Sequence, residues 1–252
     1  MVSTKSLLLA AFTTITATYA APTKGPCKSL TPTLPSTGGD DLVAPSPTAR
    51  LKKIAIGHGI QNYTCSGPDA TPSATGALAV LYDVTTLYPG LSKTASLSIE
   101  AFNSLPHALL WDRPVPLNRP SNSSYSANTS SPFPSSHEDL KGLANCPALK
   151  YAGHHYFDST GTPTFDLDAI GMKASVLKTG SVSAPKDADR GVLDTGAVAW
   201  LRLTDSGKGM SKGVNLVYRV ITAGGNAEGC GAAGVGTTQS VPYTTFYWFY
   251  EE

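Results

Sequence analysis

Three histidines in strand-like segments have the side chains best suited to chemistry in this sequence: His58, His154 and His155. Imidazole nitrogens bind metal ions, and imidazole is a general base whose pKa lies near neutral pH. Neighbouring residues of a strand point to opposite faces, so His154 and His155 cannot serve one site unless the strand is bulged. A site would combine His58 with one of the pair and with a carboxylate, for which the candidates are Asp158, Asp166 and Asp168.

The hypothesis of a metal centre therefore uses His58, His154 and Asp158 as ligands. The alternative is that one of the adjacent histidines packs in a half-buried position while the other is exposed. This alternative is favoured, because a histidine in a strand more often packs than binds a metal ion. The sequence predicts no resident cofactor.

Two other motifs resemble catalytic or cofactor signatures but lack the context that those signatures need. The run Gly229–Gly234 matches G-x-G-x-x-G, which requires a following helix to hold a pyrophosphate. Only 18 residues follow it, they read as a strand, and no helix is expected there. The run Gly209–Gly213 matches G-x-S-x-G, but a strand follows Ser211 and all five histidines precede it, unlike the order in that hydrolase fold.

Four cysteines and an N-terminal leader indicate an oxidising compartment. Residues 1–20 combine Lys5, a short apolar run and a small-residue cleavage pattern, as a secretory signal peptide does, with Ala21 as the first mature residue. An even number of cysteines without C-x-x-C spacing favours two disulfides over a zinc site. We favour Cys65 with Cys230, which end strand-like segments, and Cys27 with Cys146, which lie in proline-containing stretches; the other two pairings stay open.

The surface chemistry points to a neutral extracellular protein. The formal net charge is +1, which is not the strongly basic charge of a nucleic-acid-binding protein. No segment is long and apolar enough to span a membrane. Three sequons predict N-glycosylation, at Asn62, Asn122 and Asn128. Aromatic side chains that could stack on sugar rings are Trp111, Tyr82, Tyr88 and Tyr243, with core packing as the default for each.

Most of the chain alternates polar and apolar residues with period two, the pattern of strands with one wet face. Within Ala95–Ala101, for example, Leu97 and Ile99 alternate with polar residues. Further strands are expected near Ile54–Ile60, Ala77–Val84, His154–Asp158, Thr162–Leu167, Lys173–Lys178, Ala197–Thr204, Gly213–Thr222 and Val241–Tyr250. Eight or nine short strands predict an all-β fold, either an antiparallel sandwich or a barrel.

Irregular segments frame the predicted strands. Residues 21–50 form a Pro/Ser/Thr-rich lead-in to a single β domain over 51–252, and residues 114–136 form a Pro/Ser/Asn-rich surface insertion. Helices should be few, with one short helix within Glu138–Leu149. The last strand, Val241–Tyr250, is apolar on both faces and should be central, covered on both sides.

Several of these segments together resemble a fungal secreted family defined by a domain of unknown function, DUF3455. The resemblance is carried by Ile54–Cys65, Gly76–Asp83, Gly153–Asp158, Gly161–Phe165, Ala199–Leu201, Val217–Gly225 and Val241–Tyr250. It implies a secreted, β-rich domain and carries over no reaction and no catalytic residue. Members are often labelled malate dehydrogenases; this chain does not support that label, because its dinucleotide-like motif lacks the required context and its strands do not alternate with helices.

The sequence therefore favours a secreted, non-catalytic protein associated with a surface or cell wall, with carbohydrate as the expected partner. The alternative is an extracellular enzyme, either metal-dependent through His58 and His154 or auxiliary to a biosynthetic pathway. A third hypothesis, an effector that binds a host protein, has no feature for or against it.

Overall fold

Eight antiparallel strands close into an up-and-down barrel. The computed structural model describes residues 32–92, 97–121, 125–143, 146–234 and 236–252. The strands are β1 (Arg50–Thr64), β2 (Ser73–Asp83), β3 (Lys150–Phe157), β4 (Pro163–Leu167), β5 (Met172–Val182), β6 (Trp200–Asp205), β7 (Leu216–Gly224) and β8 (Thr238–Glu251). Each pairs with the next in the chain, and β8 pairs with β1. The predicted all-β class is confirmed, and of the two architectures the barrel is the one observed.

The barrel interior is a packed core. All eight strands contribute buried apolar side chains to it, among them Phe165, Leu203, Val217, Tyr247 and Phe249. Inward positions of β1 are small so that these rings fit: a Cβ on Gly57 would lie 2.7 Å from the Tyr247 ring. These buried side chains fill the interior, as the width of an eight-stranded barrel allows.

A second buried layer covers the outside of the barrel wall. It includes η1 (Thr85–Leu87), α1 (Ile99–Asn103) and α2 (Leu105–Asp112). Phe102 of α1 stacks on Phe246 of β8 with ring centroids 4.5 Å apart. Strand β8 is thus buried on both faces along 241–250, as its two-sided apolar sequence predicts.

Two expected elements are wrong. The segment Ala95–Ala101 is not a strand in its described part: Ser98 caps α1, and its hydroxyl accepts a hydrogen bond from the backbone N–H of Ala101. Serine at an N-cap favours a helix more strongly than the local alternation favours a strand. The expected helix within Glu138–Leu149 is absent from its described residues, where an isolated bridge joins Leu140 to Leu149.

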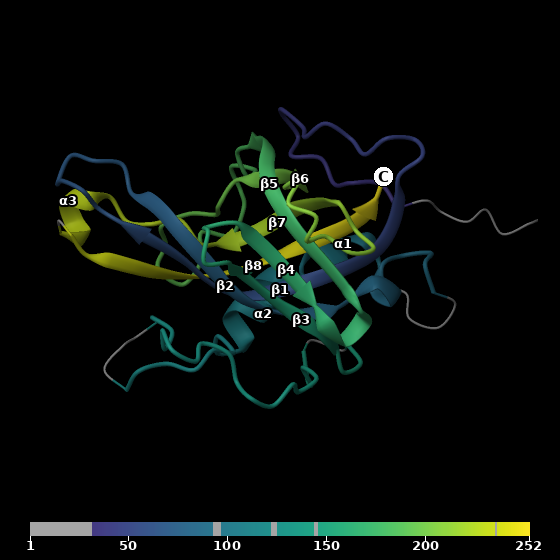
Figure 1. Cartoon of the computed structure of the whole chain (residues 1–252), viewed down its shortest axis with the longest axis horizontal. Coiled ribbons are helices and arrows are strands. Elements are labelled where there is room, and N and C mark those ends of the chain that lie inside the picture. Colours follow the sequence, from purple (N-terminus) through teal and green to yellow (C-terminus); the bar gives the residue numbers. More distant parts are fainter. Residues whose placement is uncertain (1–31, 93–96, 122–124, 144–145, 235) are drawn as a thin grey trace, which may run out of the picture.

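The remaining short helices lie between strands. A 3-10 turn, η2 (Asp168–Ile170), follows β4, and α3 (Cys230–Ala233) precedes β8. The one-turn α3 lies within the glycine-rich run itself, and the described residues that follow the run, 236–252, hold β8 and no helix, as predicted. Figure 1 shows β1, β2 and β8 running past the other strands toward α3.

Two irregular segments lie against the outer wall. Residues 32–49, which we call the strap, hold no helix or strand and precede β1; residues 113–149, which we call the long connection, join α2 to β3. In Figure 1 the strap (purple) and the long connection (teal) lie on opposite sides of the barrel. Two cavities lie beneath these segments, one under each.

Candidate functional site

His58 is a buried packing residue on the outer face of β1. Only 1% of it is exposed, its Nε2 lies 3.2 Å from the carbonyl oxygen of Arg113, and its Nδ1 lies 3.0 Å from the Thr244 hydroxyl. A carbonyl only accepts, so Nε2 carries the proton and Nδ1 accepts from Thr244. Burial lowers the pKa of His58 to about 4. Both nitrogens are therefore used to hold the long connection and β8 in place.

His154 lies on the same face but two strands away. His58 pairs with Val80 of β2, and Val80 pairs with His154 of β3, so the two backbones are roughly 10 Å apart. The His154 ring stacks on Phe133 of the long connection with centroids 3.9 Å apart. A zinc ion lies about 2.1 Å from each of its ligand nitrogens. His58 and His154 do not meet this requirement, because their backbones are two strands apart and the His154 ring is stacked on another residue.

Asp158 is a turn residue rather than a neighbour of the histidines. One of its oxygens accepts from the hydroxyl and N–H of Thr160 and from the N–H of Thr162. The Thr160 hydroxyl bond, followed by the other bonds to this carboxylate, lowers the pKa of Asp158 to about 2. Within the part of the chain that the structure describes, no group of three or more His, Cys, Asp or Glu side chains is placed to hold a metal ion.

The adjacent histidines do point to opposite faces, but neither is exposed. His154 is half-buried, whereas only 4% of His155 is exposed, because its face of β3 lines the barrel interior. The His155 ring stacks on Phe165, and its Nδ1 donates to the carbonyl of Thr164 over 2.9 Å. Burial lowers the pKa of His155 to about 4. The expectation that one of the pair is exposed is therefore wrong.

We expect acid to destabilise the fold through these two buried histidines. Their folded-state pKa of about 4 lies below the ordinary value of 6.5, so between these values the unfolded chain binds protons that the folded chain does not. The free energy that these neutral histidines contribute to folding is fully present at pH values above 6.5, and it decreases as the pH falls toward 4. In urea unfolding, the wild type should lose about 2 to 3 kcal/mol more between pH 7 and 4.5 than His58→Gln, which keeps both hydrogen bonds without titrating.

The control for this experiment is Met210→Ala, which shortens an exposed side chain that does not titrate. It should keep the pH dependence of the wild type. Equal pH dependence of the wild type and His58→Gln would contradict a neutral, buried His58.

The three cysteines that the structure describes form one bridge. Cys65, at the end of β1, is bonded to Cys230, the first residue of α3, so this predicted pair is confirmed. Cys146 is a free cysteine in the structure, and its predicted partner Cys27 lies outside the described residues. That second pairing stays a prediction.

A groove of about 830 Å³ lies between the barrel and the long connection. Strands β1, β2, β3 and β8 form one wall, and residues 126–133 of the long connection form the other. The wall residues include three aromatic rings: Phe133, Tyr156 and Phe157. Amide and hydroxyl groups complete it, including Asn62, Asn128, Thr238 and Ser240. None of the described residues that line the groove is Asp, Glu, Lys, Arg or His.

The sequon asparagines lie in this groove. The Asn62 Oδ1 accepts from the Ser240 hydroxyl over 2.8 Å, while the Asn128 Oδ1 accepts from the N–H groups of Ser130 and Ser131. Asn128 is exposed, whereas Asn62 is half-buried. The third sequon asparagine, Asn122, lies outside the described residues.

The aromatic residues singled out from the sequence do not form the groove. Tyr82, Tyr88 and Tyr243 are buried core residues, and the Trp111 ring is 53% exposed and donates from Nε1 to Asp189. The rings that line the groove lie in the long connection and at the end of β3. The alternation within His154–Asp158 predicts the strand that holds Tyr156 and Phe157. Phe133 lies near them only because the long connection folds back over the barrel.

The DUF3455 family model, a protein family of unknown function, matches residues 45–251. The chain belongs to the DUF3455 family. The match covers the whole barrel, both walls of the groove and the end of the strap. No curated protein and no solved structure matches the chain. In the described part of this DUF3455 protein, no helix has the length and apolar character needed to cross a membrane.

Proposed function

We propose that this DUF3455 protein is a secreted, non-catalytic binding protein for a neutral oligosaccharide of an extracellular surface or cell wall. One observation carries the proposal: a groove of about 830 Å³ combines three aromatic rings with amides and hydroxyls, and no charged residue lines it in the part of the chain that the structure describes. The site of the proposed binding is this groove, between the barrel and residues 126–133.

The lining chemistry suits a sugar. The C–H faces of a pyranose ring are apolar and pack on aromatic rings, while its hydroxyls bond to amides and hydroxyls. Phe157 is 37% exposed, which leaves its ring available for such packing. The groove volume falls in the usual range of roughly 300 to 1,000 Å³ for ligand sites.

The same lining argues against catalysis at this groove. Glycoside hydrolysis generally needs a pair of carboxyl groups beside the bond that breaks, and no Asp or Glu lines the groove. The alternative of a metal-dependent enzyme rests on His58 and His154. Both ring nitrogens of His58 are hydrogen-bonded to other groups, and the His154 ring stacks on Phe133. These contacts argue against a metal ion shared by the two histidines.

Export to the cell exterior is part of the proposal. It is supported by the leader-like residues 1–20 and by three sequons, and the Cys65–Cys230 bridge is compatible with an oxidising compartment. Because Asn62 and Asn128 lie in the groove, a glycan on either one would occupy part of it. The variants Thr64→Ala and Ser130→Ala remove these sequons while keeping both asparagines.

The class of ligand is tested on an array of oligosaccharides with the protein recovered from a eukaryotic secretion host, after sequencing confirms Ala21 as its first residue. The array holds hexamers of β-1,3-glucan, β-1,4-glucan and N-acetylglucosamine beside a hexamer of galacturonic acid. We expect binding to at least one neutral hexamer and at least tenfold weaker binding to the acidic one, because the groove has no cation.

The sequon variants Thr64→Ala and Ser130→Ala serve as the control and should bind at least as well as the wild type. Absence of binding to every neutral hexamer by both the wild type and these variants would contradict the proposal. A preference for the galacturonic acid hexamer would also contradict it.

A further inference from the structure

The strap covers an aromatic surface on the outer wall of the barrel. Strands β6, β7 and β8 each contribute one ring to this surface: Trp200, Tyr218 and Tyr250. Leu34 and Leu42 of the strap pack against the same buried cluster. The three aromatic residues, which we call the aromatic face, are all buried, and the strap is one of the segments that cover them.

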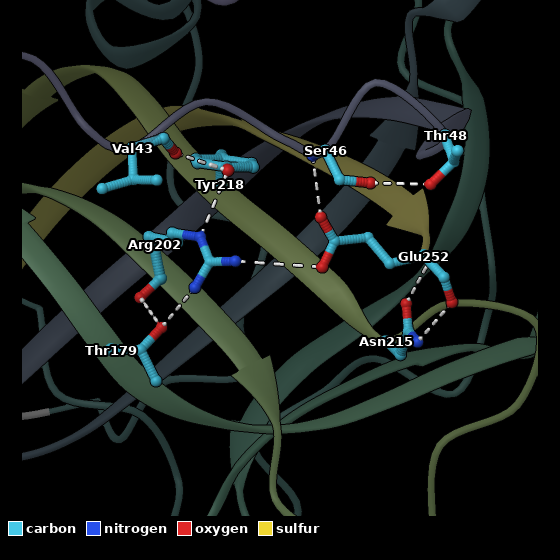
Figure 2. A network of polar contacts seen from close by, with 8 residues as sticks. All are labelled: Val43, Ser46, Thr48, Thr179, Arg202, Asn215, Tyr218 and Glu252. Carbon is cyan, nitrogen blue, oxygen red and sulfur yellow. Dashed lines mark hydrogen bonds and ion pairs between the residues drawn. The ribbon is translucent and has the colours of Figure 1, made fainter.

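Few hydrogen bonds hold the strap on the barrel, and Figure 2 shows them from close by. The Tyr218 hydroxyl donates to the carbonyl of Val43 over 2.7 Å and accepts from Nε of Arg202 over 3.3 Å. The Glu252 carboxylate accepts from the N–H of Ser46 over 3.0 Å. Among the described residues, these two bonds are the ones that join the strap to the rest of the chain. Neither joins two backbone groups, so the strap is not part of the sheet.

The strap also fits the aromatic face loosely. A cavity of about 450 Å³ lies between them, lined by strap residues and by Trp200, Val220 and Tyr250. Protein interiors hold few voids larger than a water molecule, so the strap leaves part of the face without packed partners. The cavity is separate from the oligosaccharide groove, with which it shares no lining residue.

The extent of the family match separates the aromatic face from its cover. The match spans residues 45–251, so all three residues of the face lie inside it, whereas strap residues 32–44 lie outside it. The face therefore belongs to the part of the chain that defines the family, and most of the segment that covers it does not.

The composition of the strap indicates which kind of segment suits the face. Residues 32–49 contain four prolines and two leucines, and their charged residues are Asp40 and Asp41. Proline-rich segments bind aromatic-lined surfaces because their extended backbone loses little entropy on binding and has carbonyls free to accept hydrogen bonds. The bond from the Tyr218 hydroxyl to the Val43 carbonyl is a contact of this kind.

We propose that the aromatic face is a docking site for an extended, proline-rich and leucine-containing segment of a partner protein, and that the strap occupies this site in the partner's absence. Leucines of the partner segment replace Leu34 and Leu42 on the face, and one of its carbonyls replaces that of Val43 at the Tyr218 hydroxyl. The strap is then a tethered competitor, with an effective concentration of roughly millimolar. Loosening the strap should therefore strengthen the binding of the same segment added as a free peptide.

The test measures, by fluorescence anisotropy, how tightly the mature chain binds a fluorescein-labelled peptide with the sequence of residues 32–45. The peptide ends before Ser46, so it makes no bond to Glu252. Glu252→Ala removes the bond that holds Ser46 of the strap and keeps all three residues of the aromatic face. It should bind the peptide about threefold to tenfold more tightly than the wild type.

A change within the strap should have a larger effect. The double variant Leu34→Ser, Leu42→Ser removes both leucine contacts of the strap and should bind the peptide at least tenfold more tightly than the wild type. The matched control is Val43→Ser, which changes a strap side chain that is 74% exposed and should leave the affinity unchanged. A peptide with serine in place of both leucines should bind the double variant at least tenfold more weakly.

The hydroxyl of the face is tested in the double variant, where the strap no longer competes. Adding Tyr218→Phe should weaken peptide binding about threefold to tenfold, because the peptide loses the donor to its Val43 carbonyl. Urea unfolding shows which variants are folded, and the comparison of Glu252→Ala with the wild type decides the question if the double variant is not.

Three results would overturn the inference. One is the same affinity for the peptide in the wild type and in the folded variants with a loosened strap. The second is equal binding of the leucine and serine peptides. The third is a Tyr218→Phe change without effect in the double variant.

Discussion

Replacing Gly59 with alanine should lower the free energy of unfolding by about 3 kcal/mol or more, or prevent folding altogether. Gly59 of β1 pairs with Ala79 of β2. A Cβ at this position would lie 1.9 Å from the carbonyl oxygen of Leu78 and 2.6 Å from Cα of Ala79. Both are backbone atoms of a strand held on its other side by β3, so the clash is relieved only by breaking the β1–β2 ladder.

The matched control is Gly67→Ala in the β1–β2 connection, where a Cβ meets no atom within 4 Å. Its stability should stay within about 0.5 kcal/mol of the wild type. The measurement is urea unfolding followed by tryptophan fluorescence, with solubility recorded for both variants. A Gly59→Ala protein as stable as Gly67→Ala would show that β1 and β2 are not as close as described.

Removing the Cys65–Cys230 bridge should cost about 5 kcal/mol of stability. The two cysteines are 165 residues apart, so the bond restricts most of the unfolded chain, and the chain-entropy relation gives about this value for such a loop. Both cysteines are almost fully buried. The free energy of unfolding of the Cys65→Ala, Cys230→Ala double variant is the quantity to measure.

The single variants provide the control for the bridge. Cys65→Ala and Cys230→Ala each break the same bond, so each should lose nearly as much stability as the double variant. Losses that add up, with each single variant costing about half, would indicate that the two cysteines stabilise the fold separately and are not bonded.

The strands were predictable because period-two alternation is a local property. The strands His154–Asp158 and Thr162–Leu167, for example, are predicted from the sequence, and they are observed as the antiparallel pair β3 and β4. Barrel closure was not predictable, since it depends on the pairing of β1 with β8, which lie nearly two hundred residues apart. Alternation alone fits a sandwich equally well.

The errors in secondary structure also have local causes. Leu97 and Ile99 alternate like a strand, but Ser98 provides the N-cap of α1. Within Glu138–Leu149, Gly142 has φ +69°, a backbone conformation that an α-helix cannot contain. Each case shows a single residue outweighing a weak periodic signal.

The candidate site was the least predictable part. His58, His154 and Asp158 have the residue types of a metal site, but whether a ring nitrogen is free depends on tertiary partners, such as the carbonyl of Arg113 at His58. The groove was not visible in the sequence, because its two walls come from strands and from a proline-rich segment that folds back over them. Its neutrality is likewise a property of the assembled surface.

The central claim, that the groove of this DUF3455 protein binds a neutral oligosaccharide, is tested most directly by calorimetric titration with the neutral hexamer that binds best on the array. The wild type should bind with one site per chain, and Phe157→Ala should bind about tenfold more weakly, because it removes one packing ring. Met210→Ala, which shortens an exposed side chain outside the groove, should bind as the wild type does. Equal affinity of all three proteins would contradict the account and place binding away from the groove.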